Sequence, residues 1–426
     1  MTNRWRVAAA LAWIVSACGL LTGCGGGSAS TPKTITGIAI SGAPIKVFDH
    51  TKDKQEAWNI PDAAVSAWRD ASGQISMVVP HRENYRMTGP DLEHLKIEPH
   101  KIFSSAQSSM QIPEADANYT QWLLTPYTLD GTTIHMLTHM EWYGCLLNGD
   151  CAITSTDGNG ADTDSWVSSA SQMISTDGGA NFHLDNTAGS HVAASPGYKW
   201  TGTTALNDRI YLHALNHSGL FSTSRLIREG SGFYTIGYII LRDFTRVDPA
   251  TGIYQAPVTL FGYVLLRTVD LTDPGSWQGW EGGSSWAPAS TARYKTFLPM
   301  QNGQMLNGSS PQIVYDTVAQ CYILIHTIFG GSNAVYYMTT RSLASPKWSD
   351  TKEIAGTASL VTDPGGPVKG FNDQNYISLL DDASEGINFE TTSGSPQLFY
   401  NTSPGQYGGD NLGRDIYRLQ LTISYR

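Results

Sequence analysis

The sequence predicts an all-β fold built from repeated hairpins. Residues 73–81 and 131–139 each run from a turn glycine through an apolar segment to a histidine eight residues later. Another strand-like run, 63–68 or 122–128, precedes each of them, which is the pattern of two strands joined by a tight turn. No long stretch repeats its apolar residues at the 3.6-residue period of a helix. The 43 glycines and 20 prolines among 426 residues also favour a fold rich in turns.

The hairpin pattern continues along the rest of the chain. Four further segments are paired runs rich in Tyr, Ile, Val, Thr and Phe, with turns at Asp-Gly, Gly-Gly, Asn-Gly and Asp-Pro. They span residues 209–217, 232–241, 312–326 and 374–400. The sequence therefore predicts a mostly β chain.

The first residues have the composition of an export signal. Arg4 and Arg6 form a basic start, and an apolar segment at 7–21 leads into Cys24. That apolar core is too short for an ordinary transmembrane anchor. The stretch Leu-Leu-Thr-Gly-Cys resembles the lipobox of bacterial lipoproteins, in which the signal is cut before the cysteine and the cysteine is acylated. The resemblance implies a signal peptide at 1–23.

The lipobox resemblance also implies a location in the bacterial cell envelope. Residues 24–36 are expected to form the lipidated cysteine and a flexible Gly/Ser tether. The residue after the cysteine is Gly25 rather than an aspartate, which resembles lipoproteins that are sent on to the outer membrane. We expect a monomeric domain in the periplasm or at the cell surface, attached to the membrane through the lipid alone.

Three cysteines remain beyond the lipobox. Cys145 and Cys151 bracket a five-residue loop, and we expect them to form a disulfide in this oxidising compartment. Cys321 lies in a strand-like run and is expected to be a buried free thiol. The sequence contains no Cys-x-x-Cys or Cys/His zinc spacing, so we expect no cysteine-based metal site.

Charge and aromatic content constrain the partner. The chain has a formal net charge of −10 and no run of Lys or Arg, which argues against a nucleic-acid partner. The 12 tryptophans and 20 tyrosines suit a ligand with flat apolar faces, although aromatic residues also favour strands for packing reasons alone. We expect a neutral or locally recognised ligand, such as an oligo- or polysaccharide.

Short motifs indicate how the sheets are arranged. Residues 175–182, Ser-Thr-Asp-Gly-Gly-Ala-Asn-Phe, resemble the Asp-box of sialidases and other β-propellers. In that motif the hydroxyl and the aspartate hold a tight turn, and the aromatic ring packs under a neighbouring strand. Two further segments, around Asp270 with Trp277 and around Leu343 with Trp348, resemble the outer strands of five-bladed propeller glycosidases of glycoside hydrolase family 43.

These resemblances imply a five-bladed β-propeller of four-stranded antiparallel blades over residues 37–426, with six blades as the alternative. The five blades are expected at 37–104, 119–183, 192–261, 262–349 and 354–426. In a propeller, the start of each innermost strand and the end of each second strand meet on one face. Polar residues at those positions are therefore expected to converge.

The candidate site follows from that convergence. Asp62 precedes the first strand of blade one, and His81 and Arg82 end its second strand. The other candidates stand near strand ends of later blades: His139, Glu141, Trp142, Glu229, His326 and Asp373.

The family resemblance implies glycoside hydrolysis at this face. The reaction needs a carboxylic acid and a carboxylate separated by roughly 5 to 9 Å. Asp62 resembles the family's blade-one base. Glu141 and Glu229 are alternatives for the acid, since Glu141 lies in blade two whereas the family's acid opens blade three, and Asp373 is a further catalytic candidate. We expect the sugar to be bound by His81, Arg82, His139, Trp142, Arg69 and His326.

Three alternatives stay open. Some propeller glycosidases hold Ca²⁺ in the central channel, which the resemblance allows here although no ligand set is evident. A sialidase would need a cluster of arginines to grip a carboxylate; the candidates are Arg69, Arg82, Arg228, Arg293 and Arg414. A non-catalytic glycan-binding lipoprotein would use the same aromatic and carboxylate groups for binding alone.

Overall fold

The structure is a computed structural model that describes most of the chain. It covers residues 31–56, 59, 61–105, 120–143, 166–187, 189–196, 218–243, 257–297, 300–301, 304–305, 308–328, 334–357, 375–402 and 413–426. The chain divides into two compact units, Met1–Pro32 and Lys33–Arg426, and every strand named below belongs to the second. In the described ranges the regular structure is β-strand apart from one 3₁₀ turn, η6 (Pro274–Ser276), so the all-β prediction is confirmed.

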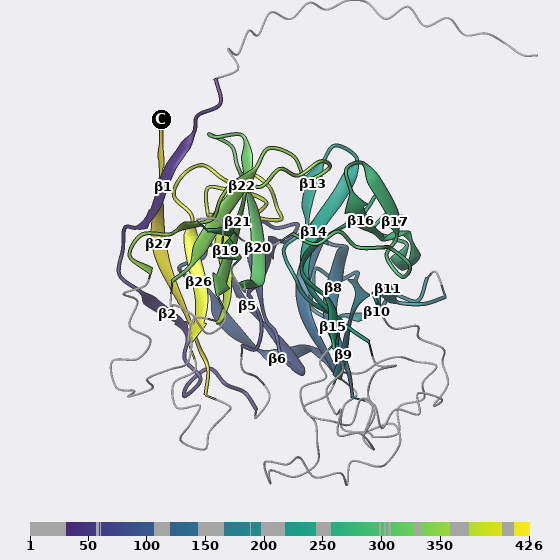
Figure 1. Cartoon of the computed structure of the whole chain (residues 1–426). Coiled ribbons are helices and arrows are strands. Elements are labelled where there is room, and N and C mark those ends of the chain that lie inside the picture. The colour runs from purple at the N-terminus through teal and green to yellow at the C-terminus, as the bar shows by residue number, and fades with distance from the viewer. Residues whose placement is uncertain are drawn as a thin grey trace, which may run out of the picture. The chain divides into compact units, whose positions relative to one another are not determined.

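The strands form antiparallel groups that follow one another along the chain (Figure 1). The first group contains β3 (Ser66–Arg69), β4 (Ile75–Val79), β5 (Glu83–Gly89) and β6 (Lys96–Ser104). The second contains β7 (Thr120–Thr128), β8 (Ile134–Tyr143) and β9 (Trp166–Ser175), with β10 (His183–Leu184) and β11 (Val192–Ala194) beside β9.

The third group contains β12 (Ser218–Thr223), β13 (Ile227–Glu229), β14 (Gly232–Arg242), β15 (Val258–Thr268), β16 (Gln278–Gly282) and β17 (Ser285–Pro288). A short parallel contact between β12 and β9 joins it to the second group in one sheet. A separate hairpin, β18 (Met300–Gln301) and β19 (Gln304–Met305), follows.

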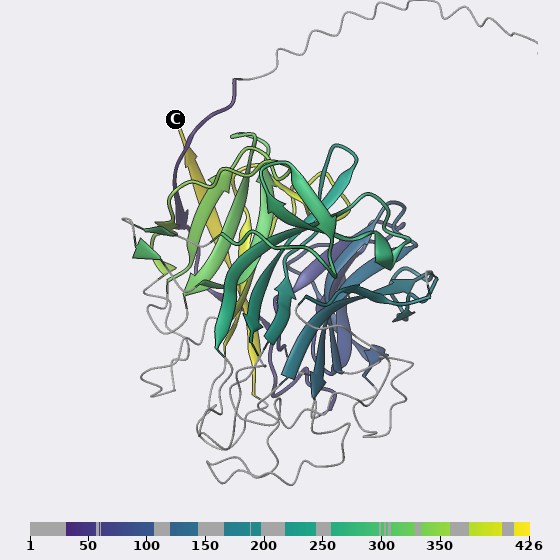
Figure 2. The same cartoon turned by 45° about the vertical axis from the view of Figure 1, so that its right-hand side comes forward.

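The last two groups of strands form two further sheets (Figure 2). The fourth contains β20 (Gly308–Asp316), β21 (Cys321–Ile328), β22 (Tyr336–Thr340) and β23 (Lys352–Glu353), with β25 (Thr391–Thr392) parallel to β20. The fifth contains β24 (Asn375–Leu380), β26 (Gln397–Thr402) and β27 (Asp415–Tyr425), together with the N-terminal strands β1 (Ile35–Ile40) and β2 (Ile45–Phe48).

Strands β1 and β2 differ from the expected blade boundaries. The sequence placed residues 37–104 in one blade, whereas both strands pair with β27 at the other end of the domain. Strand β1 also begins at Ile35, two residues before the expected start of the domain. Order along the chain favours local hairpins and gives no signal for a pairing between distant strands, which is why these two strands were assigned to the wrong blade.

Apolar side chains join each group to the next. One hydrophobic cluster lies at each junction, and the fifth group packs against the first, so the groups close a ring. Each cluster holds residues from two neighbouring groups. In order around the ring, examples from the five clusters are Trp68 and Ile134, Leu137 and Leu220, Leu265 and Leu324, Ile323 and Leu398, and Phe399 and Met77. This is a β-propeller arrangement; the count of five blades for the whole chain stays a prediction.

Aspartates hold the turns that follow innermost strands. In four groups a carboxylate oxygen accepts backbone N–H bonds from the next few residues, which fixes a tight turn. The acceptors are Asp70, Asp130, Asp316 and Asp381. The glycine of the second turn, Gly131, has a left-handed φ of 74°, and an added Cβ would lie 2.4 Å from the nitrogen of Ala71.

Side-chain hydrogen bonds hold the turn at residues 175–182. The Ser175 hydroxyl donates to Asp177 and accepts from Gly179 N–H, and Asp177 accepts from Asn181. Burial opposes ionisation of Asp177, but the hydrogen bonds from Asn181 and Ser175 outweigh it and lower the pKa to about 2. The ring of Phe182 packs edge-on against Trp68, with 6.3 Å between centroids. Among the described residues, no helix is long and apolar enough to cross a membrane.

Candidate functional site

Asp62 and His81 meet because they flank one hairpin. Strands β3 and β4 are antiparallel, and the backbone N–H of Asp62 donates to the carbonyl of Pro80 at 2.9 Å. This bond brings the residue before β3 beside the residues after β4. His81 Nε2 then lies 3.4 Å from Asp62 Oδ2, so the predicted convergence of these two residues is present.

The Asp62 carboxylate has partners from three other segments. Arg414, just before β27, forms an ion pair with Oδ1. The indole N–H of Trp122 on β7 donates to Oδ2 at 3.2 Å, and the hydroxyl of Tyr376 on β24 donates to Oδ1 at 3.4 Å. A guanidinium in contact favours the charged form of a carboxylate. A fifth of the Asp62 side chain is exposed.

Trp122 connects Asp62 to a second pair of candidates, His139 and Glu141. Its ring lies 6.0 Å from the ring of His81 and 5.3 Å from that of His139, which is its cross-strand partner on β8. Trp122 is 4% exposed, so it orients its neighbours rather than offering an open face to a ligand. His81 and His139 therefore both contact the ring of Trp122.

Glu141 extends this cluster. Its Oε1 lies 3.0 Å from Nε2 of His139, and its side chain is largely buried. Tyr376 has both carboxylates as neighbours. Burial and then the charge of Glu141 raise the pKa of Tyr376 to about 12, while its hydroxyl donates to Asp62. Asp62, His81, Trp122, His139, Glu141, Tyr376 and Arg414 together form what we call the Asp62 cluster.

Tyr376 adopts a strained backbone. Its φ of 58° lies in the left-handed region, which costs a non-glycine residue about 1–2 kcal/mol. Such conformations persist where the surroundings fix them, and they concentrate at functional sites. The strain at Tyr376 therefore marks this end of β24 as a candidate position for function.

His81 is held in its neutral form. Burial, and then the positive charge of Arg82, lower its pKa to about 3. At neutral pH the imidazole can therefore accept or donate a hydrogen bond without bringing charge to the Asp62 cluster. Arg82 follows His81 in the chain, and its role in binding a ligand stays a prediction.

His326 lies in a different environment. Its ring stacks on Tyr336, with 5.8 Å between centroids, and meets Tyr263 edge-on at 6.1 Å. Nδ1 lies 3.4 Å from the carbonyl oxygen of Thr327, and burial lowers the pKa of the ring to about 4. A chain of ring contacts through Phe221, Tyr238 and Tyr263 links it to His139, but His326 is not a member of the Asp62 cluster.

Two other candidates are bound elsewhere. The Glu229 carboxylate, on β13, accepts from the Ser342 hydroxyl and from the N–H groups of Leu343 and Ala344. It thus fixes the loop after β22. Arg69 lies at the far end of β3, where Nη2 donates to the carbonyl of Asp382 at 3.0 Å. The structure brings neither residue to Asp62.

Several sequence candidates cannot be placed. Asp373, Cys24, Cys145 and Cys151 lie outside the described residues, as does the side chain of Trp142. Cys321 is a buried free thiol, as predicted.

Three members of the cluster were not identified as site residues from the sequence. Trp122 was recognised only as part of a strand, and Arg414 only as one of five arginines for a sialidase site. Tyr376 lies three residues after Asp373, and only Asp373 was a candidate in that segment. Arg414 and Tyr376 are each more than 300 positions from Asp62, and neither belongs to a local motif. A pattern confined to neighbouring residues therefore could not find them.

A polar network lies farther along β7 than Trp122. The hydroxyl of Thr125 lies 2.8 Å from that of Thr223 and donates to the carbonyl of Ser224. Arg225, which is fully buried, donates to the carbonyls of Phe389 and Leu379, both at 2.7 Å. This network ties the second, third and fifth groups together.

Side chains of the kinds that bind metal ions gather at one place in the described part of the chain. Asp49, His50 and Asp415 lie close enough to share an ion. Lys46 Nζ lies 2.7 Å from Asp415 Oδ2, and His50 Nδ1 lies 2.7 Å from Oδ1, so an ammonium and an imidazole already contact both oxygens. These residues are not members of the Asp62 cluster.

The chain was compared with known proteins. No protein-family model and no curated protein matches it. Similar solved structures include the catalytic domain of a GH62 α-L-arabinofuranosidase from Coprinopsis cinerea, at 10% identity and a TM-score of 0.46 over 91% of this chain and 98% of that one. A GH43_1 enzyme from Xanthomonas citri complexed with xylotriose is 11% identical, with a TM-score of 0.46 over 90% and 92%.

A third structure has the same level of similarity. It is an endo-1,5-α-L-arabinanase from Thermotoga petrophila RKU-1, 12% identical, with a TM-score of 0.46 over 86% of this chain and 72% of that one. At such identities and scores, an activity for this chain has to be argued from its own residues.

Proposed function

We propose that this protein is a carbohydrate-active protein that acts as a glycoside hydrolase through Asp62 and Glu141. The observation that carries the proposal is the gathering of two carboxylates around Trp122 and Tyr376. Glycoside hydrolysis uses such a pair, one group to protonate the leaving oxygen and the other to activate water or attack the anomeric carbon.

The contacts suggest a role for each carboxylate. The ion pair with Arg414 favours the charged form of Asp62, which a base or a nucleophile needs. Glu141 is then the acid that protonates the glycosidic oxygen. His139, hydrogen-bonded to Glu141, is a positioning residue. Tyr376 joins the two carboxylates and is partly exposed, so it is placed to contact a bound sugar.

A non-catalytic glycan-binding function is the second candidate. The Asp62 carboxylate already has contacts from Arg414, Trp122, Tyr376 and His81, which occupy much of its acceptor capacity. In that case the cluster shapes a binding surface and performs no chemistry. The five arginines of the sialidase alternative are not gathered together, because Arg69 bonds to Asp382 and Arg228 lies over Phe233.

The test is sugar release by the domain at 28–426. Reducing ends would be measured across plant and bacterial polysaccharides for the wild type, Asp62→Asn and Glu141→Gln. We expect each substitution to lower the rate by about 100- to 10,000-fold, the usual contribution of a general acid or base. Glu385→Gln, at an exposed glutamate, is the matched control and should keep full activity.

Two outcomes would decide between the candidates. Release that survives both substitutions would show that other residues do the chemistry. No release from any polysaccharide, with glycan binding that Asp62→Asn leaves intact, would favour the glycan-binding function. Circular dichroism of each variant separates lost activity from lost fold.

The cell-envelope assignment is part of the same proposal. The lipobox-like segment supports acylation at Cys24, and the motif at residues 175–182 supports an Asp-box in the second blade. Cells expressing the full chain should incorporate a labelled fatty acid into the protein. Label that persists in Cys24→Ala would contradict a lipid anchor at this residue.

A further inference from the structure

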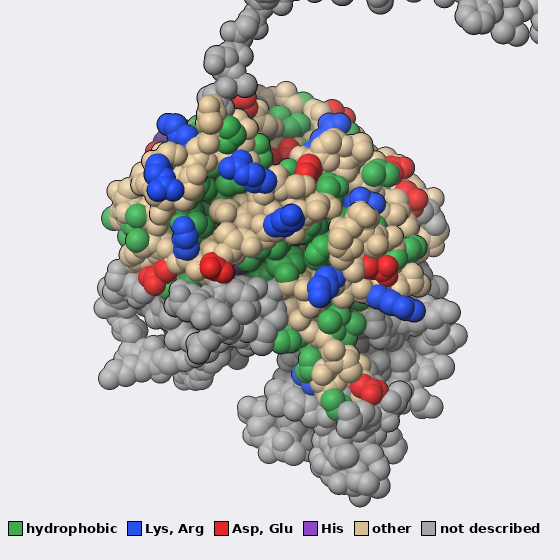
Figure 3. Space-filling view, turned by 45° about the horizontal axis from the view of Figure 1, so that its top comes forward, with side chains coloured by type: hydrophobic (Ala, Val, Ile, Leu, Met, Phe, Trp, Pro, Cys, Tyr) green, Lys and Arg blue, Asp and Glu red, His purple; other side chains and the backbone are tan. Residues whose placement is uncertain are grey.

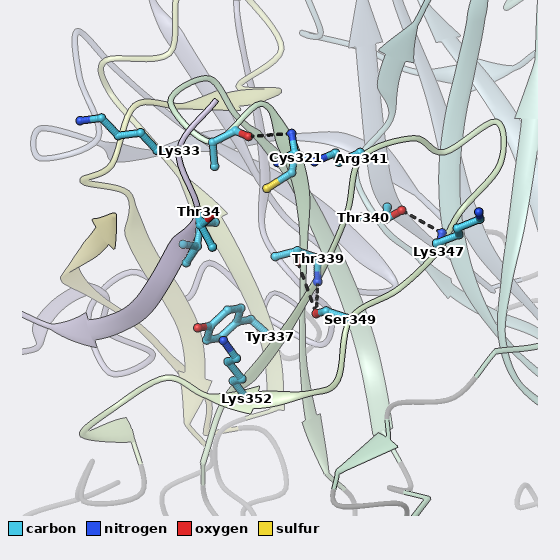
Figure 4. Close-up of a pocket in the computed structure, with 12 residues that line it drawn as sticks. Lys33, Thr34, Cys321, Tyr337, Thr339, Thr340, Arg341, Lys347, Ser349 and Lys352 are labelled. Atoms are coloured by element: carbon cyan, nitrogen blue, oxygen red, sulfur yellow. Dashed lines mark hydrogen bonds between the residues drawn. The ribbon is translucent and has the colours of Figure 1, made fainter. Parts of the chain in front are cut away.

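A pocket of about 330 Å³ lies on the fourth group, away from the Asp62 cluster (Figure 4). Its wall begins at Lys33 and Thr34, just before β1, and crosses β21 at Cys321. It continues over β22 and the loop that follows, as far as Lys352. No member of the Asp62 cluster lines this pocket.

The pocket is lined by cations and by no acid. Lys33, Arg341, Lys347 and Lys352 contribute to its wall, while Asp and Glu are missing from it. The chain as a whole carries more acidic than basic residues, with 37 Asp and Glu against 27 Lys and Arg. Four cations around one hollow are therefore a local reversal of the overall charge, which raises the concentration of anions there.

These cations also lack acidic partners. Other basic residues in the described part of the chain form ion pairs within 4.0 Å; they include Lys46, Lys52, Arg86, Lys101 and Arg418. None of the four pocket cations has such a pair among the described residues. Figure 3 shows Lys and Arg side chains, with several Asp and Glu side chains among them, spaced over one face of the domain.

A buried carboxylate beside the pocket, that of Asp316, is already satisfied. Asp316 lies opposite Cys321 in the β20–β21 ladder. It accepts from the N–H groups of Val318 and Ala319 and from the hydroxyl of Tyr425 at 2.6 Å. Burial and then the charge of Asp316 raise the pKa of the Cys321 thiol to about 11, so the thiol adds no negative charge to the pocket at neutral pH.

Donor groups complete the wall. Thr339, Thr340 and Ser349 bring hydroxyls to the same hollow, and these donate within the protein, to Ser349 Oγ and to the carbonyls of Ser342 and Asp350. Arg341 uses one N–H on the carbonyl of Ala319 at 3.4 Å, and a guanidinium has five donors in all. Ammonium and guanidinium donors around one hollow are groups that bind phosphate.

We propose that this cationic pocket binds a phosphate group. The favoured source is the headgroup of an anionic phospholipid, and this preference rests on the proposed acylation of Cys24. Lys33 is only nine positions after Cys24, and a fully extended chain of that length spans about 30 Å at most. A lipid on Cys24 would therefore keep the pocket close to a membrane surface, where phosphate groups are abundant.

The test uses the chain from residue 24 on with Cys24→Ser, so that no lipid is attached. Inorganic phosphate binding would be measured by calorimetry. Sedimentation would compare vesicles of phosphatidylcholine alone with vesicles containing 30% phosphatidylglycerol. The pocket variant is Lys347→Gln with Lys352→Gln, and the control variant is Lys96→Gln with Lys295→Gln. All four lysines are exposed, so both variants change the net charge equally and should fold.

We expect the pocket variant to bind phosphate at least tenfold more weakly, and the control variant to match the parent chain. Sedimentation with the phosphatidylglycerol vesicles that is lost in the pocket variant identifies a headgroup as the source. Phosphate binding without sedimentation identifies soluble phosphate instead. Equal losses in the two variants, or no phosphate binding by the parent chain, would overturn the proposal. None of these outcomes changes with sugar release, because Asp62 and Glu141 do not line the pocket.

Discussion

Asp62 shows how a single carboxylate can organise a candidate site. Its partners come from β7 in the second group, and from β24 and the residue before β27 in the fifth. With Asp62 itself beside the first group, three groups of strands meet at its two carboxylate oxygens. Breaking its ion pair with Arg414 would leave an unpaired charge in a mostly enclosed position, which is unfavourable. The position of Asp62 therefore depends on the closed ring as well as on its own hairpin.

His81 should make stability depend on pH. The pKa falls from 6.5 in a model imidazole to about 3 in the folded protein, so the unfolded chain takes up this proton first. The contribution of His81 to stability is complete above about pH 6.5 and is lost as the pH falls toward 3. We expect the free energy of unfolding, measured by urea titration, to drop between pH 7 and pH 4 by an amount on the order of 2 kcal/mol that His81→Asn removes.

The exposed His183 provides the control for that experiment. His183→Asn should keep the pH dependence of the wild type. A His81→Asn variant with the same slope as the wild type would mean that another group, such as the buried His326, is responsible.

Local sequence could predict only part of the cluster. Asp62 and His81 were predicted to converge because one hairpin holds both, and the bond from Asp62 to Pro80 fixes that geometry. Glu229 was a reasonable candidate by its place in the chain, yet its carboxylate faces the loop after β22. Which neighbour a side chain turns toward is decided by packing between strands, and no motif in the sequence records it.

Among the elements, β1 has a role that its length does not suggest. This six-residue strand pairs with β27, and its residue Ile38 accepts from the backbone of Ala355 in the fourth group at 2.9 Å. Ile38 is 2% exposed and packs in the cluster between the fourth and fifth groups. The strand thus stabilises a junction as well as a sheet edge.

Two isoleucines can measure that role. Ile38→Ala should lower the free energy of unfolding by about 2–5 kcal/mol, because it removes buried methyl groups and leaves a cavity. Ile45→Ala, in the neighbouring strand β2, should cost about 0.5 kcal/mol or less, since Ile45 is half exposed. Denaturant titration of both variants measures the difference. Equal losses would mean that β1 adds little beyond ordinary strand pairing.

Sequence reasoning worked well for hairpins and poorly for long-range pairing. The strand–turn–strand units at 63–81 and 122–139 are present because turn glycines and alternating residues act locally. The placement of β1 and β2 beside β27 has no such local cause.

At the scale of the whole molecule, the ring is held by similar junctions repeated between groups. Each junction buries aliphatic and aromatic side chains from both sides, at roughly 25 cal/mol per Å² of apolar surface. The composition predicted this all-β architecture. It could not predict which groups would close the ring, because closure depends on contacts between the two ends of the domain.

The pairing of β1 with β27 also sets an order of events during synthesis. A ribosome makes β1 early, but the strand with which it forms its ladder is absent until the residues of β27 have been made. Until then the nascent domain can form hairpins but no closed ring. A chain that must cross a membrane before folding would gain from this delay, because the last step of assembly cannot occur before its final strand arrives.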